Sequence, residues 1–119
     1  MKKCLHVPIY DAVVWLVVSD EIHATRKSRS MVKLFGEPPP AEVDWAALCD
    51  YNGRGIFGIF VGSESLTVDV IAHEVFHLTY RILEWASAGV DKGNHEAGAL
   101  LHGYLMNLIS GILGPLAKR

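Results

Sequence analysis

TVDVIAHEVFHLTYRILEW, residues 67–85, is the stretch of sequence that decides the fold. Its large apolar residues recur at alternating steps of four and three, which places them on one face of an α-helix; they are Ile71, Val75, Leu78, Ile82 and Trp85. A polar stripe of His73, His77, Tyr80 and Glu84 lies nearly opposite. Ser65 or Thr67 can cap the N-terminus of this helix. We therefore predict a helix from about Val68 into the mid-80s, with one face in the core and the other facing a site.

The polar stripe contains His73-Glu74-Val75-Phe76-His77, which matches the HExxH pattern. Residues four apart on a helix lie on the same face, roughly 6 Å apart, so two imidazoles can bind one ion. Zinc binds neutral histidine nitrogens, and a catalytic zinc site keeps one position open for water. Glu74 lies roughly 100° around the helix from His73, where its carboxylate can activate that water as a general base. The pattern predicts a hydrolytic Zn²⁺ centre, and surface or hydrogen-bonded histidines are the alternative.

Such a centre requires a third protein ligand, because two histidines leave the tetrahedral coordination of zinc incomplete. Glu96, which follows His77 with 18 residues between, is the best candidate. His95 is the second candidate and Asp91 a weaker one. If the motif helix ran to Gly89, its end would lie about 18 Å beyond His77, so the connection would have to return along the helix.

The glutamate that follows HExxH lies in the segment Asn94-His95-Glu96-Ala97. HExxH followed at this distance by a glutamate in such a segment resembles the glutamate-ligand zincins, or gluzincins. The resemblance implies that His73, His77 and Glu96 hold zinc and that Glu74 is the catalytic base.

A further resemblance extends over roughly the C-terminal half of the chain. Through residues 71–77, residues 94–97 and Leu101-x-Gly103-Tyr104-Leu105, the chain is similar to short HExxH proteins encoded by bacteriophages and prophages. It implies a viral protein that acts in the cytoplasm of a bacterial host. Five polar residues near the motif could orient the ligands or stabilise a transition state, although ordinary packing is the alternative for the last two; they are Tyr80, Glu84, His95, His102 and Tyr104.

The rest of the sequence predicts an α+β domain. The other regular elements that we expect are a strand over 13–18, a helix over 21–35, a second strand over 56–61, and a last helix from an Asn94 cap to about Ser110 or Gly111. Between them we expect a surface connection at Pro38–Pro40, a helical turn over 44–48 and a turn over 51–55. Residues 1–119 would form one minimal zincin-like domain, with a small sheet packed on about three helices and the motif helix at the centre.

Gly58 interrupts the second expected strand, which indicates a bulge or a close approach of neighbouring groups. This strand could bind an extended peptide by edge pairing and present it to the metal, or it could be an ordinary core strand. The predicted reaction is hydrolysis of a peptide or related amide bond in a peptide or protein substrate.

Composition restricts the classes of protein that remain possible. Half of the 119 residues are hydrophobic and 20% are charged, which indicates one folded domain and excludes a disordered chain. The net charge of -2 provides no overall field for binding nucleic acid or an anionic membrane. We expect no membrane partner, because no apolar stretch approaches roughly 20 residues. Cys4 and Cys49 form no disulfide framework, which suits a reducing cytoplasm.

Two other functions fit the same residues. One is a noncatalytic, metal-stabilised phage accessory or binding protein, in which the metal only joins the two C-terminal helices. The other is a DNA-associated protease, because the helix expected over 21–35 carries Arg26, Lys27, Arg29 and Lys33. A solvated basic face is the ordinary interpretation of those four residues.

Overall fold

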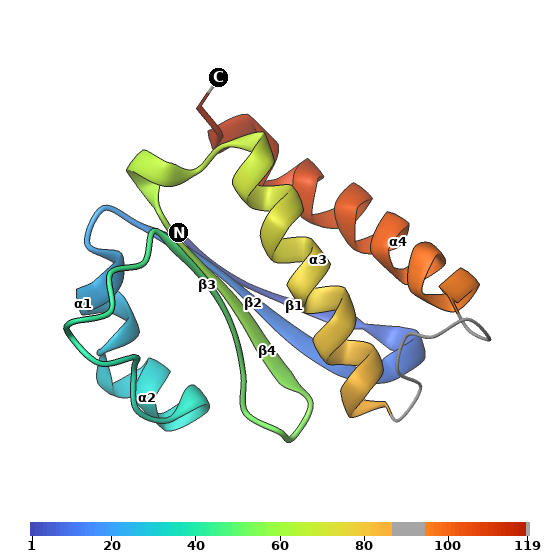
Figure 1. Ribbon diagram of the computed structural model, residues 1–119, viewed down its shortest axis with the longest axis horizontal. Coiled ribbons are helices and arrows are strands. Elements are labelled where there is room, and N and C mark those ends of the chain that lie inside the picture. The colour runs from blue at the N-terminus through green and yellow to red at the C-terminus, as the bar shows by residue number, and fades with distance from the viewer. Residues whose placement is uncertain (87–94, 119) are drawn as a thin grey trace.

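A four-stranded mixed sheet lies at the centre of the computed structural model, which describes residues 1–86 and 95–118 (Figure 1). The strands are β1 (Lys2–Val7), β2 (Ala12–Ser19), β3 (Ala47–Tyr51) and β4 (Ile56–Gly62). Their order in the sheet is β1-β2-β4-β3, with β2 and β4 parallel and each edge strand antiparallel to its neighbour. The predicted α+β class is confirmed.

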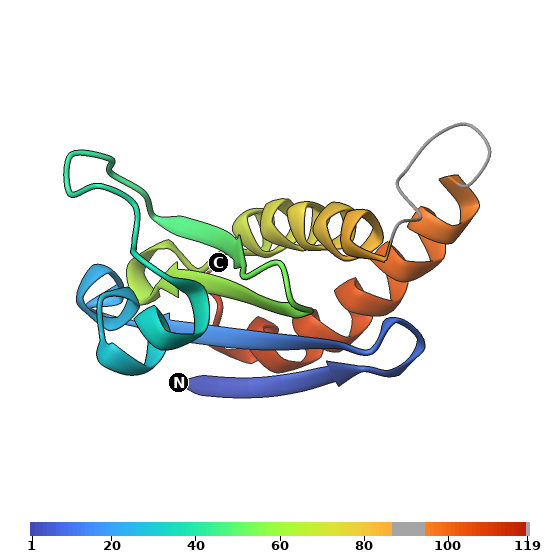
Figure 2. The same ribbon diagram turned by 90° about the horizontal axis from the view of Figure 1, so that it is seen from below.

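Helices cover both faces of this sheet (Figures 1 and 2). On one face lie the short helices α1 (Ile22–Arg26) and α2 (Arg29–Phe35). On the other lie α3 (Val68–Trp85), which is the predicted motif helix, and α4 (His95–Leu113). Three single 3-10 turns complete the described elements: η1 (Pro8–Tyr10), η2 (Ser63–Ser65) and η3 (Gly114–Leu116).

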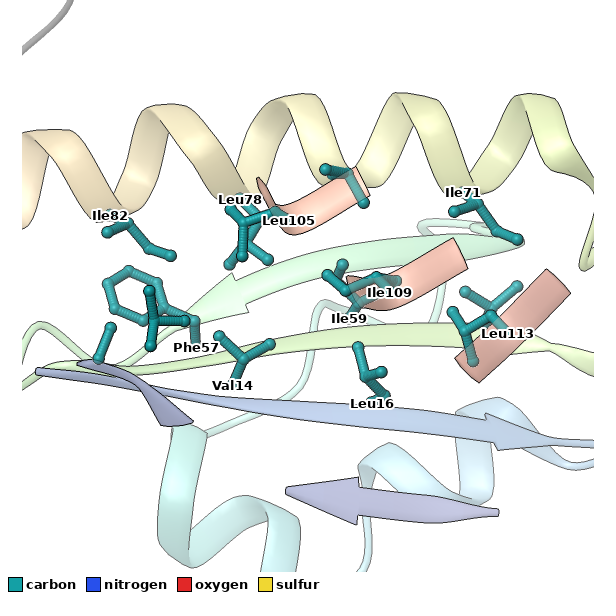
Figure 3. Close-up of a cluster of buried hydrophobic side chains, with 14 of the residues drawn as sticks. Val14, Leu16, Phe57, Ile59, Ile71, Leu78, Ile82, Leu105, Ile109 and Leu113 are labelled. Atoms are coloured by element: carbon teal, nitrogen blue, oxygen red, sulfur yellow. The ribbon is translucent and has the colours of Figure 1, made fainter. Parts of the chain in front are cut away.

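The larger core lies between the sheet and the pair α3 and α4 (Figure 3). Because successive strand residues point to opposite faces, β2 and β4 each send every second side chain toward the helices. The side chains labelled in Figure 3 are buried and come from β2, β4, α3 and α4 in turn: Val14, Leu16, Phe57, Ile59, Ile71, Leu78, Ile82, Leu105, Ile109 and Leu113. The predicted apolar stripe of α3 therefore anchors the motif helix and leaves its opposite face free.

A smaller core holds α1 and α2 against the other face of the sheet. Its buried members are Val17 and Phe60 from the strands, with Ile22, Met31 and Phe35 from the helices. β4 is thus buried on both faces and lies between two other strands. The prediction that β4 offers a free edge to a peptide is wrong, and the alternative of a core strand is confirmed.

The start of α3 agrees with the prediction from its capping residues. Thr67 has an extended backbone, and its hydroxyl oxygen accepts a hydrogen bond from the amide of Val70 at 3.2 Å. Asp69 lies in the first turn, where a negative charge favours the helix dipole. α3 therefore begins at Val68, as expected, and this boundary sets which residues face the sheet.

The edge strands were missed by the sequence analysis. β1 was not predicted, because Lys2–Val7 mixes charged and apolar residues and is mostly exposed. Residues 44–48 were expected to form a helical turn, but Ala47–Tyr51 is a strand paired with β4 from Ala47↔Val61 to Tyr51↔Phe57. This pairing with a distant strand decides the conformation, which local propensity could not do. The turn that follows is confirmed, with positive φ at Gly53 and Gly55.

The helix expected over 21–35 is broken into α1 and α2 at Lys27 and Ser28. Arg26 is only 1% exposed, and its Nη2 donates to Asp50 Oδ2 of β3 at 2.8 Å while its Nη1 donates to the carbonyl of Gly36 at 3.0 Å. The break thus lets α2 fold back, so that backbone carbonyls at its C-terminal end accept hydrogen bonds from the buried guanidinium of Arg26. Arg26 is consequently no part of an exposed basic surface, whereas Lys27, Arg29 and Lys33 remain exposed.

We predict that Arg26→Ala lowers the free energy of unfolding by about 2 kcal/mol, because it leaves Asp50 and buried carbonyls without their cationic partner. Urea denaturation measures this difference. Lys27→Ala is the matched control, since Lys27 is exposed and its replacement should change stability by less than about 0.5 kcal/mol. Equal stabilities for the two variants would contradict the role given to Arg26.

Gly58 is explained by a close approach of side chains. A Cβ atom at this position would lie 2.8 Å from both Phe35 Cζ and Phe60 Cε2. The pairing of β4 with β2 and β3 continues through Gly58 without interruption, so the expected alternative of a bulge is excluded. The glycine lets α2 pack directly on the sheet.

α4 is the most apolar helix of the fold, and no charged residue occurs between Glu96 and Lys118. Within the described part of the chain, His95–Leu116 is the one segment long and apolar enough to cross a membrane by length and composition. The expectation that no stretch has this length is therefore wrong. In the fold, α4 packs beside α3 and buries Leu101, Leu105 and Ile109 in the larger core, although only 22% of this membrane-length window is buried.

Candidate metal centre

His73 and His77 lie one turn apart on the exposed face of α3, and their rings converge. Their Nε2 atoms are 3.1 Å apart, and the ring centroids are 4.7 Å apart. Two nitrogens bound to one tetrahedral zinc at the usual bond length would lie about 3.3 Å apart. The pair therefore has the spacing that a shared zinc ion requires. A hydrogen bond between one protonated and one unprotonated Nε2 would have the same length, so the ordinary alternative also fits the distance.

Glu74 lies beside this pair but is buried, with 5% of its surface exposed. Its Oε1 is 3.9 Å from His73 Nε2, and its Oε2 is buried without a hydrogen-bond partner in the described part of the chain. Burial raises the pKa of the Glu74 carboxyl, and the two histidines act in the opposite direction. The two converging imidazoles fit two of the ligand positions of a zinc site, and the orphaned carboxylate oxygen of Glu74 lies beside them, where it could accept a hydrogen bond from a metal-bound water. The third protein ligand that such a site requires is not beside the pair in the described residues.

The three motif residues line an open cavity of about 270 Å³ between α3 and the edge strand. β3 forms its opposite wall with Ala47, Leu48 and Cys49. Arg81, four residues after His77, lines the same cavity. Because β3 is at the end of the sheet, its free backbone edge lies beside the candidate catalytic residues.

Sequence reasoning missed both Arg81 and the wall formed by β3. The signal for Arg81 was present, because residues 73, 77 and 81 differ by four and lie on one helix face. No signal pointed to Cys49, because its place beside α3 depends on the pairing of β3 with β4.

The structure does not bring Glu96 to the histidine pair. Glu96 is exposed in the first turn of α4, and residues 1–86 and 95–118 contain no group of three His, Cys, Asp or Glu side chains placed to hold one ion. Residues 87–94 lie outside the described residues, and they include the weaker candidate Asp91 and the expected cap Asn94. Glu96 as third ligand therefore stays a prediction.

The other polar candidates are distributed over different surfaces. Tyr80, His95 and His102 line a second cavity of about 300 Å³ between α3 and α4, together with Phe76, Thr79, Gly98 and Ala99. Tyr104 belongs to a third cavity of about 220 Å³ near η1. Glu84 is exposed and accepts a hydrogen bond from Arg81. Phe76 lies between the cavity of the histidine pair and this second cavity, because its ring centroid is 6.5 Å from that of His77 and 6.2 Å from that of His102.

Cys49 is a protonated thiol at neutral pH, because burial and the nearby Glu74 carboxylate raise its pKa to about 12. Only the thiolate is nucleophilic, so Cys49 should stay unmodified by iodoacetamide at pH 8 in the folded, metal-free protein. Cys4 is exposed and should react, and both cysteines should react in urea. Mass spectrometry of the tryptic peptides measures this difference. Rapid labelling of Cys49 in the folded protein would contradict the burial of its thiol.

Comparison with protein-family models, with curated proteins and with solved structures finds no match to this chain.

Proposed function

We propose that this chain is a zinc-dependent hydrolase that cleaves a peptide or related amide bond. The observation that carries the proposal is the convergence of His73 Nε2 and His77 Nε2 to 3.1 Å, with the Glu74 carboxylate 3.9 Å from the first of them. Core histidines are usually satisfied by separate partners, whereas these two are exposed and directed at one point in a cavity. Glu96 is proposed as the third ligand.

The chemistry follows from the residues that face the cavity. Zinc, when bound, supplies Lewis-acid chemistry that acidifies water and polarises a carbonyl oxygen. His73 and His77 would hold the ion through their Nε2 atoms. Glu74 would accept a proton from the attacking water at its free carboxylate oxygen and pass that proton to the leaving nitrogen. The raised pKa of Glu74 brings its proton affinity closer to the one that such a transfer requires.

The position of the edge strand β3 beside the cavity favours a peptide as the substrate. An extended peptide can pair with the free edge of a sheet through main-chain hydrogen bonds, without dependence on its side chains. The free edge of β3 borders the cavity that contains His73, Glu74 and His77, so a peptide paired there would pass beside all three. The edge-pairing interpretation made for β4 thus transfers to β3, which is the edge strand beside the cavity.

Metal removal tests the proposal directly. We predict that the purified chain hydrolyses an unstructured protein such as casein after addition of one equivalent of zinc, and that 1,10-phenanthroline abolishes this hydrolysis. Zinc added after removal of the chelator should restore the activity, because the histidine pair lies on a helix held by the core and does not depend on metal for its position. Release of amino groups measures the rate. Hydrolysis that persists in the chelator would exclude the proposed centre.

We place this activity in a reducing cytoplasm, in a bacterial host if the chain is phage-encoded. Both cysteines are free in the structure, with Cys4 exposed and Cys49 half-buried. The DNA-associated alternative has less support, because the burial of Arg26 leaves only Lys27, Arg29 and Lys33 on the exposed surface of α1 and α2.

A further inference from the structure

Arg81 lies in the same cavity as the motif residues, although nothing in the hydrolytic chemistry above requires it. It is four residues after His77, so its side chain leaves the same face of α3 about one turn further along. Among the described residues that line this cavity, it alone carries a permanent positive charge; the others are Ala47, Leu48, Cys49, His73, Glu74 and His77. The cavity therefore has a fixed cation at one end and the candidate metal ligands at the other.

The guanidinium of Arg81 is held in place by an aromatic ring of β3. Its Cζ lies 4.7 Å from the centroid of the Tyr51 ring, and that ring stacks on Phe57 with an interplanar angle of 19°. A guanidinium over a ring face keeps its N–H donors at its edge, where they can form the paired hydrogen bonds that a carboxylate accepts. Arg81 is thus oriented for binding an anion before any ligand arrives.

The guanidinium of Arg81 already has one carboxylate partner, Glu84. Arg81 Nη1 donates to Glu84 Oε1 at 3.3 Å, and the side chains of Arg81 and Glu84 are 44% and 62% exposed. Ion pairs this exposed contribute little, so a carboxylate from a bound peptide can displace Glu84. Burial and the Glu74 carboxylate raise the pKa of the Cys49 thiol, and the nearby positive charge of Arg81 acts in the opposite direction.

We propose that Arg81 binds a carboxylate of the peptide in this cavity, and that the site selects substrates with an anionic group near the bond that is cleaved. The inference rests on the proposed function for the identity of the ligand as a peptide. The carboxylate can belong to the C-terminus of the peptide or to a Glu or Asp side chain. Neutral peptides would pair with β3 equally well but would lack this contact.

Peptide binding tests the inference without relying on turnover. The protein is the full chain with Glu74→Gln, incubated with zinc chloride, and the probes are alanine tetrapeptides with a neutral fluorophore at the N-terminus. One pair differs only in a C-terminal carboxylate against an amide, and a second pair of amides differs only in Glu against Gln at the third position. Fluorescence anisotropy gives the four values of Kd, and the two pairs distinguish the two sources of the carboxylate.

We expect the anionic member of at least one pair to bind about three- to fivefold more tightly than its neutral partner, as for an ion pair with a partly exposed arginine. Arg81→Gln should remove this preference, and Arg81→Lys should retain part of it, since lysine keeps the charge and loses the planar donors. Glu84→Gln should increase the preference, because the competing carboxylate is gone. Arg29→Gln changes the net charge equally but lies on α2, so it should leave the preference unchanged.

Equal affinities within both pairs, no binding of any peptide, or a preference that survives in Arg81→Gln would each overturn the inference. The hydrolase proposal is judged separately, by the zinc-dependent cleavage of casein. Cleavage of casein by a protein that shows no carboxylate preference would contradict only the role of Arg81. If the protein shows a carboxylate preference that depends on Arg81 but does not cleave casein, the role of Arg81 is retained and the hydrolase proposal is rejected.

Discussion

Replacing Glu74 by glutamine should lower the rate of zinc-dependent hydrolysis by about 10²- to 10⁴-fold, the usual contribution of a general acid–base residue. Glutamine has the shape of glutamate, but its amide cannot take a proton from water. Glu74 is buried at the edge of the cavity with one oxygen that has no hydrogen-bond partner in the described residues, so this oxygen is free to face the reacting water. Steady-state cleavage of casein measures the loss.

The zinc content and the folding of Glu74→Gln provide the control for that experiment. Both should match the unmodified chain, because Glu74 is the proposed base and not a ligand. Arg29→Gln on α2 is the matched variant outside the cavity, and it should retain full hydrolysis of casein. If Glu74→Gln left the biological activity of the protein unaltered in its host, the alternative of a noncatalytic, metal-stabilised binding protein would be favoured.

The second large effect is expected for His77→Ala, which should weaken zinc binding by more than about 100-fold. Loss of a residue that only supports a ligand already costs 10- to 100-fold in affinity, so loss of a ligand itself must cost more. The reason is geometric, because the 3.1 Å separation of the two Nε2 atoms lets one ion bind both rings, and a single exposed histidine cannot hold it. Competition with a chromogenic zinc chelator measures the affinity.

Three further variants show which other side chains hold the ion. His102→Ala is the negative control and should bind zinc normally, since His102 lines the cavity between α3 and α4. Glu96→Ala should weaken binding if Glu96 completes the coordination, and His95→Ala should not. A normal affinity in Glu96→Ala with a loss in His95→Ala would transfer the role of third ligand to His95. Normal zinc binding by His77→Ala would reject the metal centre.

How well the elements could be predicted depended on whether their signals were local. The apolar stripe and the Thr67 cap of α3 belong to a single helix, and both the extent of the helix and its two faces are confirmed. β2 and β4 are short apolar runs, and they too lie where they were expected. β3 carries no such pattern, because its burial is intermediate over Ala47–Asp50 and its conformation comes from pairing with β4.

The candidate site divides in the same way. Spacing alone brings His73, Glu74 and His77 together, because one helical turn relates them. The wall opposite them was not predictable, and neither was the burial of Arg26, since both depend on contacts between segments about 24 residues or more apart, such as Arg26 with Asp50. Tyr80 and His102 were grouped with the motif by sequence, but both line a different cavity, between α3 and α4.

The sequence by itself determined the motif helix, its buried face and the convergence of two imidazoles, because the geometry of an α-helix fixes the relation of residues three and four apart. Only the tertiary structure decided that β3 and not β4 offers a free edge, that Arg81 shares the cavity with the histidine pair, and that Arg26 is buried. These features come from strand order and from the packing of distant segments, which the burial of apolar surface selects for the chain as a whole.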